Sequence, residues 1–408
     1  MKDLIAKQLS RMASFLPWFR FVQFSLLLLV VTLASFTSLE EAHAIPLYAR
    51  KHGMNCSACH QIVPTLNKFG LEYWNRGYRL PPGMDDPDNE TTPFAAWYTW
   101  RQEEQTSRDF SEGFLPKVEL ISGGPIGERF SYFIEWRIIS QQTRSDGSLR
   151  DRSGRFEDAF LNWQPDQVQT LTIGQYRAVN QVDVSRRVSV SEPLLFSAGL
   201  PGDTAPGNSR LTSLRGFSPS GRSPGVTYSL QLMQNECSAS DGLFFFATLP
   251  FVGELSIPLT TEAHTEASFE LHGETKGVFL ETFYRQGLSS LGMHAFIDDD
   301  RYLLTGVGVY NYENFFVTAG VGVDDHDGGN QRIRASGEFE YLLARCRHCD
   351  RFRPGVGFRV EDISESEPRY IPYFVVSGPN EDYTFLLQLQ FRMQEDNNAF
   401  FLDISAIH

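Results

Sequence analysis

The sequence predicts an all-β fold: an outer-membrane, up-and-down antiparallel barrel of about 16 strands that follows a small N-terminal helical domain. Three observations predict it. The chain begins with an export signal, a compact stretch bearing a sequence motif follows, and from about Thr92 onward apolar residues recur with a period of two. We therefore divide the chain into a signal peptide (1–44), an N-terminal domain (45–91) and a barrel (92–408).

The first 44 residues have the three parts of a bacterial secretory signal peptide. Basic residues precede an apolar stretch of 13 residues from Phe24 to Phe36, and Ala42-His43-Ala44 follows as a cleavage site. The apolar stretch is shorter than the ~20 residues that a membrane-spanning helix needs. We expect cleavage after Ala44 and export in a Gram-negative bacterium; a retained membrane anchor is the alternative.

Composition narrows the classes of partner. The 408 residues carry a formal net charge of −14, which argues against nucleic acid because its phosphates attract cationic surfaces. The mean hydropathy of −0.27 suits a soluble protein. It suits a transmembrane barrel equally well, because half of each strand faces a polar lumen. Outer-membrane lipid therefore stays an expected partner.

The C-terminal region has roughly 16 to 18 segments of about 9–12 residues that alternate apolar and polar side chains. Successive side chains of a strand point to opposite faces, so each segment has one apolar face and one polar or small face. The clearest segments are Phe130–Ile138, 276–286, Phe315–Asp324 and Tyr383–Gln394.

Short turns at 124–127, 165–166 and 311–314 alternate with longer connections such as 178–208 and 253–265. Short turns at one end of a barrel and long loops at the other are typical of outer-membrane barrels. A soluble β-sandwich or propeller is the alternative, because its strands also alternate. The strand length, the up-and-down order and the aromatic residues at strand ends favour the membrane barrel.

Residues 45–91 carry the motif Cys56-Ser57-Ala58-Cys59-His60, which is the covalent attachment site of a c-type haem. The thiols of Cys56 and Cys59 add across the haem vinyl groups, and His60 is placed to become the proximal iron ligand. A small disulfide hairpin beside a histidine is the alternative. The spacing of apolar residues further predicts a helix from Pro64 to Tyr78. One covalent haem c is the predicted cofactor.

Other candidate ligands are less defined. Met84 lies in a Pro-Pro-Gly-Met sequence after the haem motif and is a candidate distal iron ligand; the alternatives are a linker role for Met84 and an open iron site. Cys346 and Cys349 are expected to form a disulfide in an oxidising compartment. Zinc binding by this pair would need further ligands. Cys237 is left without a predicted partner.

Residues 46–78 resemble the N-terminal signature of the outer-membrane monohaem c-type cytochrome–porin fusion family, which includes iron-oxidising outer-membrane cytochromes. The resemblance implies a small haem domain that plugs a porin of about 16 strands. The chain departs from the family in ending at His408 rather than on an aromatic residue, and in its Cys346-Arg347-His348-Cys349 cluster. The matching residues are Pro46 to Arg50, Gly53, Cys56, Cys59, His60, Pro64, Leu66, Asn67, Phe69, Gly70, Gly77 and Tyr78.

The resemblance also implies electron transfer from an extracellular donor, most simply Fe(II), through the haem to a soluble periplasmic c-type cytochrome. We hypothesise that such a chain is an electron-transfer protein with iron:cytochrome oxidoreductase activity. We find no acid–base constellation, and outer-sphere electron transfer requires none. Two alternatives stay open: the same architecture with another extracellular donor or acceptor, and a solute porin in which the haem is structural or sensory.

Overall fold

A computed structural model of the chain describes residues 47–84, 94–106, 110–143, 147–182, 195, 222–232, 239–256, 268–272, 277–298, 301–326, 330–342, 353–364, 367–379, 384–394 and 398–407. Strands make up most of these ranges. Within them, none of the helices has the length and apolarity that a membrane-spanning helix needs.

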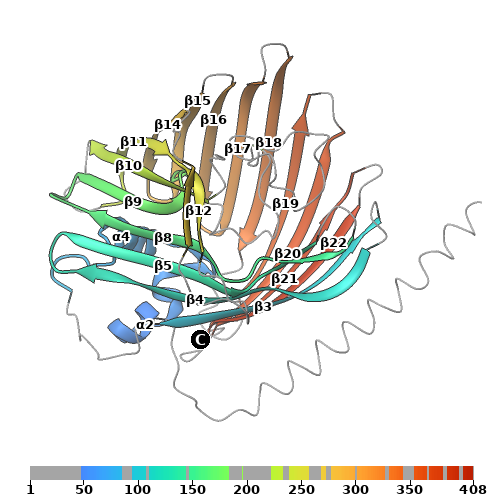
Figure 1. The fold of residues 1–408 in the computed structure, drawn as a ribbon, viewed down its shortest axis with the longest axis horizontal. Helices are drawn as coiled ribbons and strands as arrows, with labels where there is room; N and C mark the ends of the chain where they lie inside the picture. The colour runs from blue at the N-terminus through green and yellow to red at the C-terminus, as the bar shows by residue number, and fades with distance from the viewer. Residues whose placement is uncertain are drawn as a thin grey trace, which may run out of the picture. The chain divides into compact units, whose positions relative to one another are not determined.

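Sixteen of the described strands form a closed antiparallel barrel, in which each wall strand pairs with the next in the chain and β22 pairs back with β3 (Figure 1). This confirms the predicted antiparallel barrel of about 16 strands; the N-terminal haem plug domain stays a prediction. The wall strands are β3 (Ala95–Gln105), β4 (Phe110–Ile126), β5 (Phe130–Ile139), β8 (Arg155–Trp163), β9 (Gln169–Arg177), β10 (Arg222–Leu232), β11 (Gly242–Pro250), β14 (Gly277–Gln286), β15 (Ser289–Asp298), β16 (Arg301–Tyr312), β17 (Phe315–His326), β18 (Asn330–Leu342), β19 (Arg353–Ile363), β20 (Arg369–Pro379), β21 (Thr384–Arg392) and β22 (Ala399–Ile407).

Two hairpins branch from the wall. β12 (Val252–Ser256) and β13 (Ser268–His272) pair with each other between β11 and β14, which are themselves paired directly. The second hairpin, β6 (Gln141–Thr143) with β7 (Leu149–Asp151), extends the connection between β5 and β8. The predicted loop at 253–265 therefore begins inside a strand.

The two faces of the wall have the reverse of the polarity of a soluble protein. In β14, Leu280 and Tyr284 on the outer face are 45% and 49% exposed, whereas Glu281 on the inner face is 2% exposed. The faces predicted for 276–286 and 315–324 are those of the structure, with the apolar face outward. An apolar exterior around a buried polar interior is the pattern of a barrel that spans a membrane. The chain is an outer-membrane protein of the Gram-negative type.

The inner face is lined by ion pairs. Arg359 is fully buried and its guanidinium lies 3.0 Å from Glu361 and 3.6 Å from Glu338. Across the seam between the first and last wall strands, Arg101 donates two hydrogen bonds of 2.7 and 2.8 Å to the carboxylate of Asp403. Bidentate pairs of this kind fix geometry as well as adding energy. The lumen wall thus supplies most of its own counter-charges.

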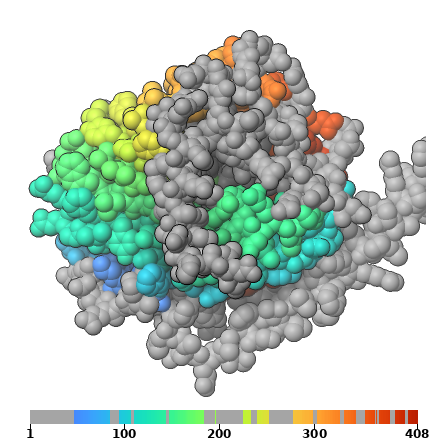
Figure 2. Space-filling model, in the orientation of Figure 1, coloured from blue at the N-terminus to red at the C-terminus, as the bar shows by residue number. Residues whose placement is uncertain are grey.

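The N-terminal segment (residues 47–84) contains three short described helices: α2 (Leu47–His52), α3 (Cys56–Cys59) and α4 (Lys68–Asn75). A two-stranded ribbon, β1 (His60–Ile62) with β2 (Thr65–Leu66), joins α3 to α4. Figure 1 shows α2 and α4 beside β4, β5 and β8, and the blue surface of this segment is visible below the same strands in Figure 2.

The N-terminal segment contacts the inner wall on two sides at one end of the barrel. On one side Ile62 is 1% exposed and packs with Leu342 and Val375. On the other side Trp74 and Tyr78 pack against Phe133 at ring-centroid distances of 5.6 and 6.0 Å. These wall residues lie near the same end as the start of β3 and the end of β22. The segment therefore lies across that mouth.

A second segment enters the lumen from β9. Residues 178–182, which we call the crossing segment, pack on the inner face of β14, β15 and β16. Ala178 and Val179 are 2% and 3% exposed and belong to one cluster with Phe279. The predicted long connection at 178–208 therefore begins with residues that turn inward rather than over the surface.

Two local predictions differ from the structure. The helix predicted from Pro64 begins only at Lys68, because Asn67 caps its first turn by accepting a 2.9 Å hydrogen bond from Gly70 N. It ends before Gly77 and Tyr78, which both have positive φ angles of 62° and 63°. The turn predicted at 124–127 is shorter, since β4 continues to Ile126.

Candidate functional site

The candidate site is the motif at residues 56–60, which lies on α3 and the residue after it. Cys56 and Cys59 are three residues apart in one helical turn, so their side chains leave the same face of the helix. Both thiols are free of disulfide bonds. A vinyl-bearing porphyrin requires this arrangement of two reactive sulfur atoms in a fixed, close pair.

The two thiols lie in different surroundings. Cys56 is 6% exposed, packs with Val63 and Ile407, and its Sγ lies 3.2 Å from Thr384 Oγ1. Cys59 is less covered. Burial raises the pKa of Cys56, and burial together with the neighbouring Cys56 raises the pKa of Cys59 to about 11. Both sulfur atoms are therefore protonated at neutral pH in the protein without haem.

His60 follows directly and is oriented by the backbone. Its Nδ1 lies 3.1 Å from the carbonyl oxygen of Pro64, and because a carbonyl can only accept, Nδ1 carries the proton. That hydrogen bond selects the tautomer whose Nε2 has the lone pair that a metal requires. Arg353 of β19 donates to the carbonyl oxygens of His60 and Gln61 at 3.3 and 3.1 Å, which ties the peptide to the wall.

The corner between α3 and α4 is tightly packed. Asn67 donates hydrogen bonds of 2.8 and 3.2 Å to the carbonyl oxygens of Ala58 and Ser57. A Cβ at Gly70 would lie 2.2 Å from the carbonyl oxygen of Cys59, so only glycine fits there. Asn67 and Gly70 both belong to the signature that this chain resembles, and both hold α4 against the thiol-bearing helix α3.

The donor set fits a covalent c-type haem. Two free thiols on one helical turn and an imidazole with its Nδ1 hydrogen-bonded to a carbonyl are the ligands and the outer-shell contact that such a group takes. The attachment of haem to Cys56, Cys59 and His60 stays a prediction.

The other predicted residues are placed as follows. Met84 is 43% exposed in a turn in which its N–H bonds to the Pro81 carbonyl oxygen at 3.3 Å. Its role as a distal ligand stays a prediction. Cys237, Cys346 and Cys349 lie outside the described residues, so the predicted disulfide stays a prediction as well.

Sequence reasoning missed the anchor of the crossing segment. The carboxylate of Glu281 accepts hydrogen bonds from the backbone N–H groups of Asn180 and Gln181 at 2.6 to 3.0 Å. His294 Nε2 lies 2.9 Å from Gln181 Oε1 and 3.3 Å from Glu281. The signal available in the sequence was a glutamate between two phenylalanines, Phe279 and Phe283, on the inner face of 276–286.

A carboxylate cluster on β4, β5 and β8 was also missed. One oxygen from each of Glu119, Glu135 and Glu157 lies within 4.8 Å of the others, and all three residues are buried. Lys117 and Arg137 lie 2.8 and 2.9 Å from Glu119, and Arg137 also contacts Glu157. The cluster therefore carries its own cations and is part of the ion-paired wall.

Taken together, strand pairing and inside-out polarity define the chain as a membrane-spanning barrel of porin-like fold. No protein-family model and no curated protein matches it. The chain is similar to the outer-membrane channel DcaP of Acinetobacter baumannii at 12% identity and a TM-score of 0.44, over 77% of this chain and 96% of that one. It is similar to OmpF of Salmonella typhi in complex with daunomycin at 12% identity and a TM-score of 0.45, over 77% and 97%.

An anion-selective porin from Comamonas acidovorans is similar at 10% identity and a TM-score of 0.44, over 77% of this chain and 98% of that one. These identities and TM-scores are too low to support a functional inference. The fold assignment therefore depends on the strand pairing of this chain, and the resemblance to the cytochrome–porin fusion family stays a prediction.

Proposed function

We propose that this outer-membrane barrel carries one covalently attached haem c and moves electrons between the outside of the cell and the periplasm. The observation that carries the proposal is the donor set at residues 56–60, with two thiols one helical turn apart and the Nδ1 of His60 held by Pro64. Haem c takes two thioether bonds and an axial ligand from such a motif.

The position of the N-terminal segment supports electron transfer between the outside of the cell and a periplasmic partner. The two longest connections of the barrel follow β9 and β11, at the end opposite to the start of β3 and the end of β22. Long loops face the outside and short turns face the periplasm in outer-membrane barrels. The N-terminal segment, at the mouth with the chain ends, is then accessible to a soluble periplasmic partner.

The bound haem would supply reversible one-electron chemistry. The chain's own residues then have three tasks: Cys56 and Cys59 tether the group, His60 presents Nε2, and Arg353 holds the His60 peptide against β19. The polar lumen provides a protein-lined passage through a hydrocarbon layer ~30 Å thick. We propose Fe(II) as the extracellular donor and a soluble c-type cytochrome as the periplasmic acceptor, with Met84 as the distal ligand.

The first test is haem attachment. In the exported full chain, Cys56→Ser with Cys59→Ser should abolish covalent haem staining on denaturing gels, because the thioether bonds can no longer form. The heat-modifiable band of the folded barrel should persist. Cys237→Ser is the control and should keep full staining. Retained covalent haem in the double variant would reject the proposal.

The second test is the donor. Outer-membrane vesicles that contain the protein are mixed with Fe²⁺ in a stopped-flow instrument, and the absorbance of reduced haem c is followed. Rapid reduction supports an iron:cytochrome oxidoreductase. If the haem is attached but Fe²⁺ leaves it oxidised, the same architecture serves another donor or acceptor.

A second candidate function is a solute channel in which the haem is structural or sensory. The observation that favours it is a cavity inside the barrel between α4 and the crossing segment, lined mostly by polar and aromatic side chains. Steady conductance of the purified full chain in planar bilayers would support the channel. A barrel that stays closed to ions would leave electron transfer as the better account.

A further inference from the structure

The cavity between α4 and the crossing segment has the size and lining of a ligand site. Its volume is about 150 Å³. A cavity of ~150 Å³ accommodates one six-membered ring, since an engineered apolar cavity of that size takes up benzene. The cavity is not enclosed, so the substituents of a larger ring would extend beyond it into the lumen. None of its lining residues belongs to the motif at 56–60, so the cavity is separate from the candidate haem attachment site.

One part of the lining is aromatic. Phe244, Phe246 and Phe283 project inward from β11 and β14, and the Phe283 ring centroid lies 4.9 and 5.7 Å from the other two. Trp74 of α4 and Phe160 of β8 add further rings, 6.2 Å apart. Aromatic side chains give a bound ring a large apolar contact at little loss of conformational entropy.

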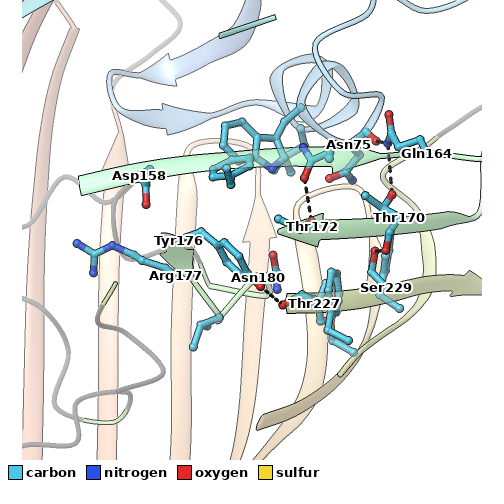
Figure 3. Close-up of a pocket in the computed structure, with 18 of the residues that line it drawn as sticks. Asn75, Asp158, Gln164, Thr170, Thr172, Tyr176, Arg177, Asn180, Thr227 and Ser229 are labelled. Carbon is cyan, nitrogen blue, oxygen red and sulfur yellow. Dashed lines mark hydrogen bonds between the residues drawn. The ribbon is translucent and has the colours of Figure 1, made fainter. Parts of the chain in front are cut away.

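The other part of the lining is polar and uncharged. Figure 3 shows Asn75, Gln164 and Thr170 at one end of the cavity, with Thr172, Tyr176 and Asn180 nearer its middle. The hydroxyls form short chains: Thr172 donates to Asn162 Oδ1 at 2.8 Å, and Thr227 lies 2.7 Å from Tyr176 and 2.6 Å from Thr248. Each hydroxyl and carboxamide can make more than one hydrogen bond, so these groups can also bind a ligand's hydroxyls.

The charged residues of the lining do not favour an ionic ligand. Arg285 is 6% exposed, lies over the Phe283 ring at 4.7 Å, and donates to the carbonyl oxygens of Asn180 and Gln181 at 3.3 and 3.1 Å. Asp158 and Arg177 have opposite charges and lie together at one end of the cavity (Figure 3). A purely apolar ring would in turn use none of the remaining hydrogen-bonding capacity of the hydroxyl and carboxamide groups.

We propose that the cavity lined by Phe246, Phe283, Thr172 and Thr227 is a binding site for a neutral, polyhydroxylated six-membered ring of monosaccharide size. The apolar face of the ring lies on the phenylalanine side chains. Its hydroxyls exchange hydrogen bonds with the threonine hydroxyls and the asparagine and glutamine carboxamides of the lining. The site is a lumenal binding site that works whether or not haem is attached, so the proposal goes beyond electron transfer.

The test uses the detergent-solubilised full chain with D-glucose as the probe, followed by saturation-transfer NMR and a titration. We expect transfer to the ring C–H protons of glucose, because these lie against the aromatic side chains. Phe246→Leu should weaken binding about fivefold, the effect of losing one aromatic contact of ~1 kcal/mol. The matched control is Phe245→Leu, one residue away on the lipid-facing side and 40% exposed, which should bind glucose as the unaltered chain does.

Two further probes make the result decisive. Cyclohexanol keeps the ring but lacks most hydroxyls and should bind much more weakly, since a polar site rejects analogues that lack the expected hydroxyls. Benzoate tests a planar anion. The proposal is overturned if glucose gives no transfer above a protein-free detergent blank, if cyclohexanol or benzoate binds better than glucose, or if Phe245→Leu and Phe246→Leu weaken binding equally. Both variants are first checked for folding, which is seen as the heat-modifiable band on a denaturing gel.

Discussion

Among the described residues, the N-terminal segment and the crossing segment both pack inside the barrel, and they are held in different ways. The N-terminal segment is attached at many points around one mouth, through Ile62 on one side and through Trp74 and Tyr78 on the other. The crossing segment is a short stretch whose polar anchor is Glu281, with His294 beside it. Distributed apolar packing resists the loss of one contact, whereas Glu281 accepts hydrogen bonds from the backbone N–H groups of two successive residues, so its replacement weakens several polar contacts at once.

The contrast suggests different mechanical roles. A segment with contacts on opposite walls behaves as part of the barrel, so its detachment requires a large free energy. The crossing segment also has apolar contacts through Ala178 and Val179, but its hydrogen bonds to Glu281 can be weakened by one substitution, and local opening proceeds at less than the global free energy of unfolding. The following predictions test the contrast, from the largest expected effect to the smallest.

Replacing Tyr78 should damage the N-terminal segment most. Tyr78 is 1% exposed and its ring lies 5.2 Å from those of Tyr48 and Trp74. Tyr78→Ala should weaken docking of the segment by about 3–5 kcal/mol, because a large buried ring leaves a cavity. Docking is measured as the rate of protease cleavage within residues 47–84 of the folded barrel at increasing urea concentrations. Tyr78→Phe keeps the ring and should stay within about 1 kcal/mol; equal protection of both variants would contradict the packing account.

The Cys59 thiol reports how well the same segment is covered. Its pKa of about 11 exceeds the ~8.5 of an unfolded thiol, so folding favours the protonated form and loses that contribution as the pH rises from about 8.5 through 11. In haem-free protein with Cys56 kept in place, alkylation of Cys59 at pH 8, read by peptide mass spectrometry, should be on the order of a hundredfold slower than in urea. A rate that levels off near pH 9 in the folded protein would refute the burial of Cys59.

Glu281→Gln tests the crossing segment. The carboxylate accepts hydrogen bonds from the N–H groups of Asn180 and Gln181, and a hydrogen bond to a charged group contributes about 1.5–3 kcal/mol. Hydrogen exchange at these two amides should therefore accelerate about 10- to 100-fold. Glu361→Gln alters another buried lumenal carboxylate and should leave exchange at 180 and 181 unchanged. Equal acceleration in the two variants would show that the anchor is not local.

The smallest effect is expected at the rim. Lys68 is half exposed and its Nζ lies 3.0 Å from Asp241. Lys68→Ala should weaken docking of the N-terminal segment by about 0.2–1 kcal/mol, and added salt should remove most of the difference. Asp241 also accepts from Gly287 N at 2.7 Å. That bond joins two parts of the barrel, so Asp241→Ala should weaken docking of the N-terminal segment about as much as Lys68→Ala; unchanged docking in both variants would contradict the ion pair.

The sequence predicted the wall well because a strand's side chains alternate with a period of two. Leu280, Glu281 and Tyr284 have the inward and outward directions that their positions in 276–286 predict. The motif at 56–60 could be recognised in the sequence because its three candidate side chains are adjacent in the chain; its role as a haem attachment site stays a prediction. Contacts between distant residues were not, and Arg101 pairs with Asp403 302 residues away. The crossing segment was missed for the same reason, since its anchor Glu281 lies 100 residues beyond Gln181.

The contacts of Cys56 with Thr384 and Ile407 depend on strands that are synthesised late. Thr384, whose hydroxyl meets that sulfur, is 328 residues further along and opens the penultimate strand, and Ile407 nearby belongs to the last. The enclosure of this sulfur is thus completed only when the final part of the polypeptide has been delivered and inserted. The Cys56 sulfur is therefore more accessible to a modifying enzyme before these strands are in place than after.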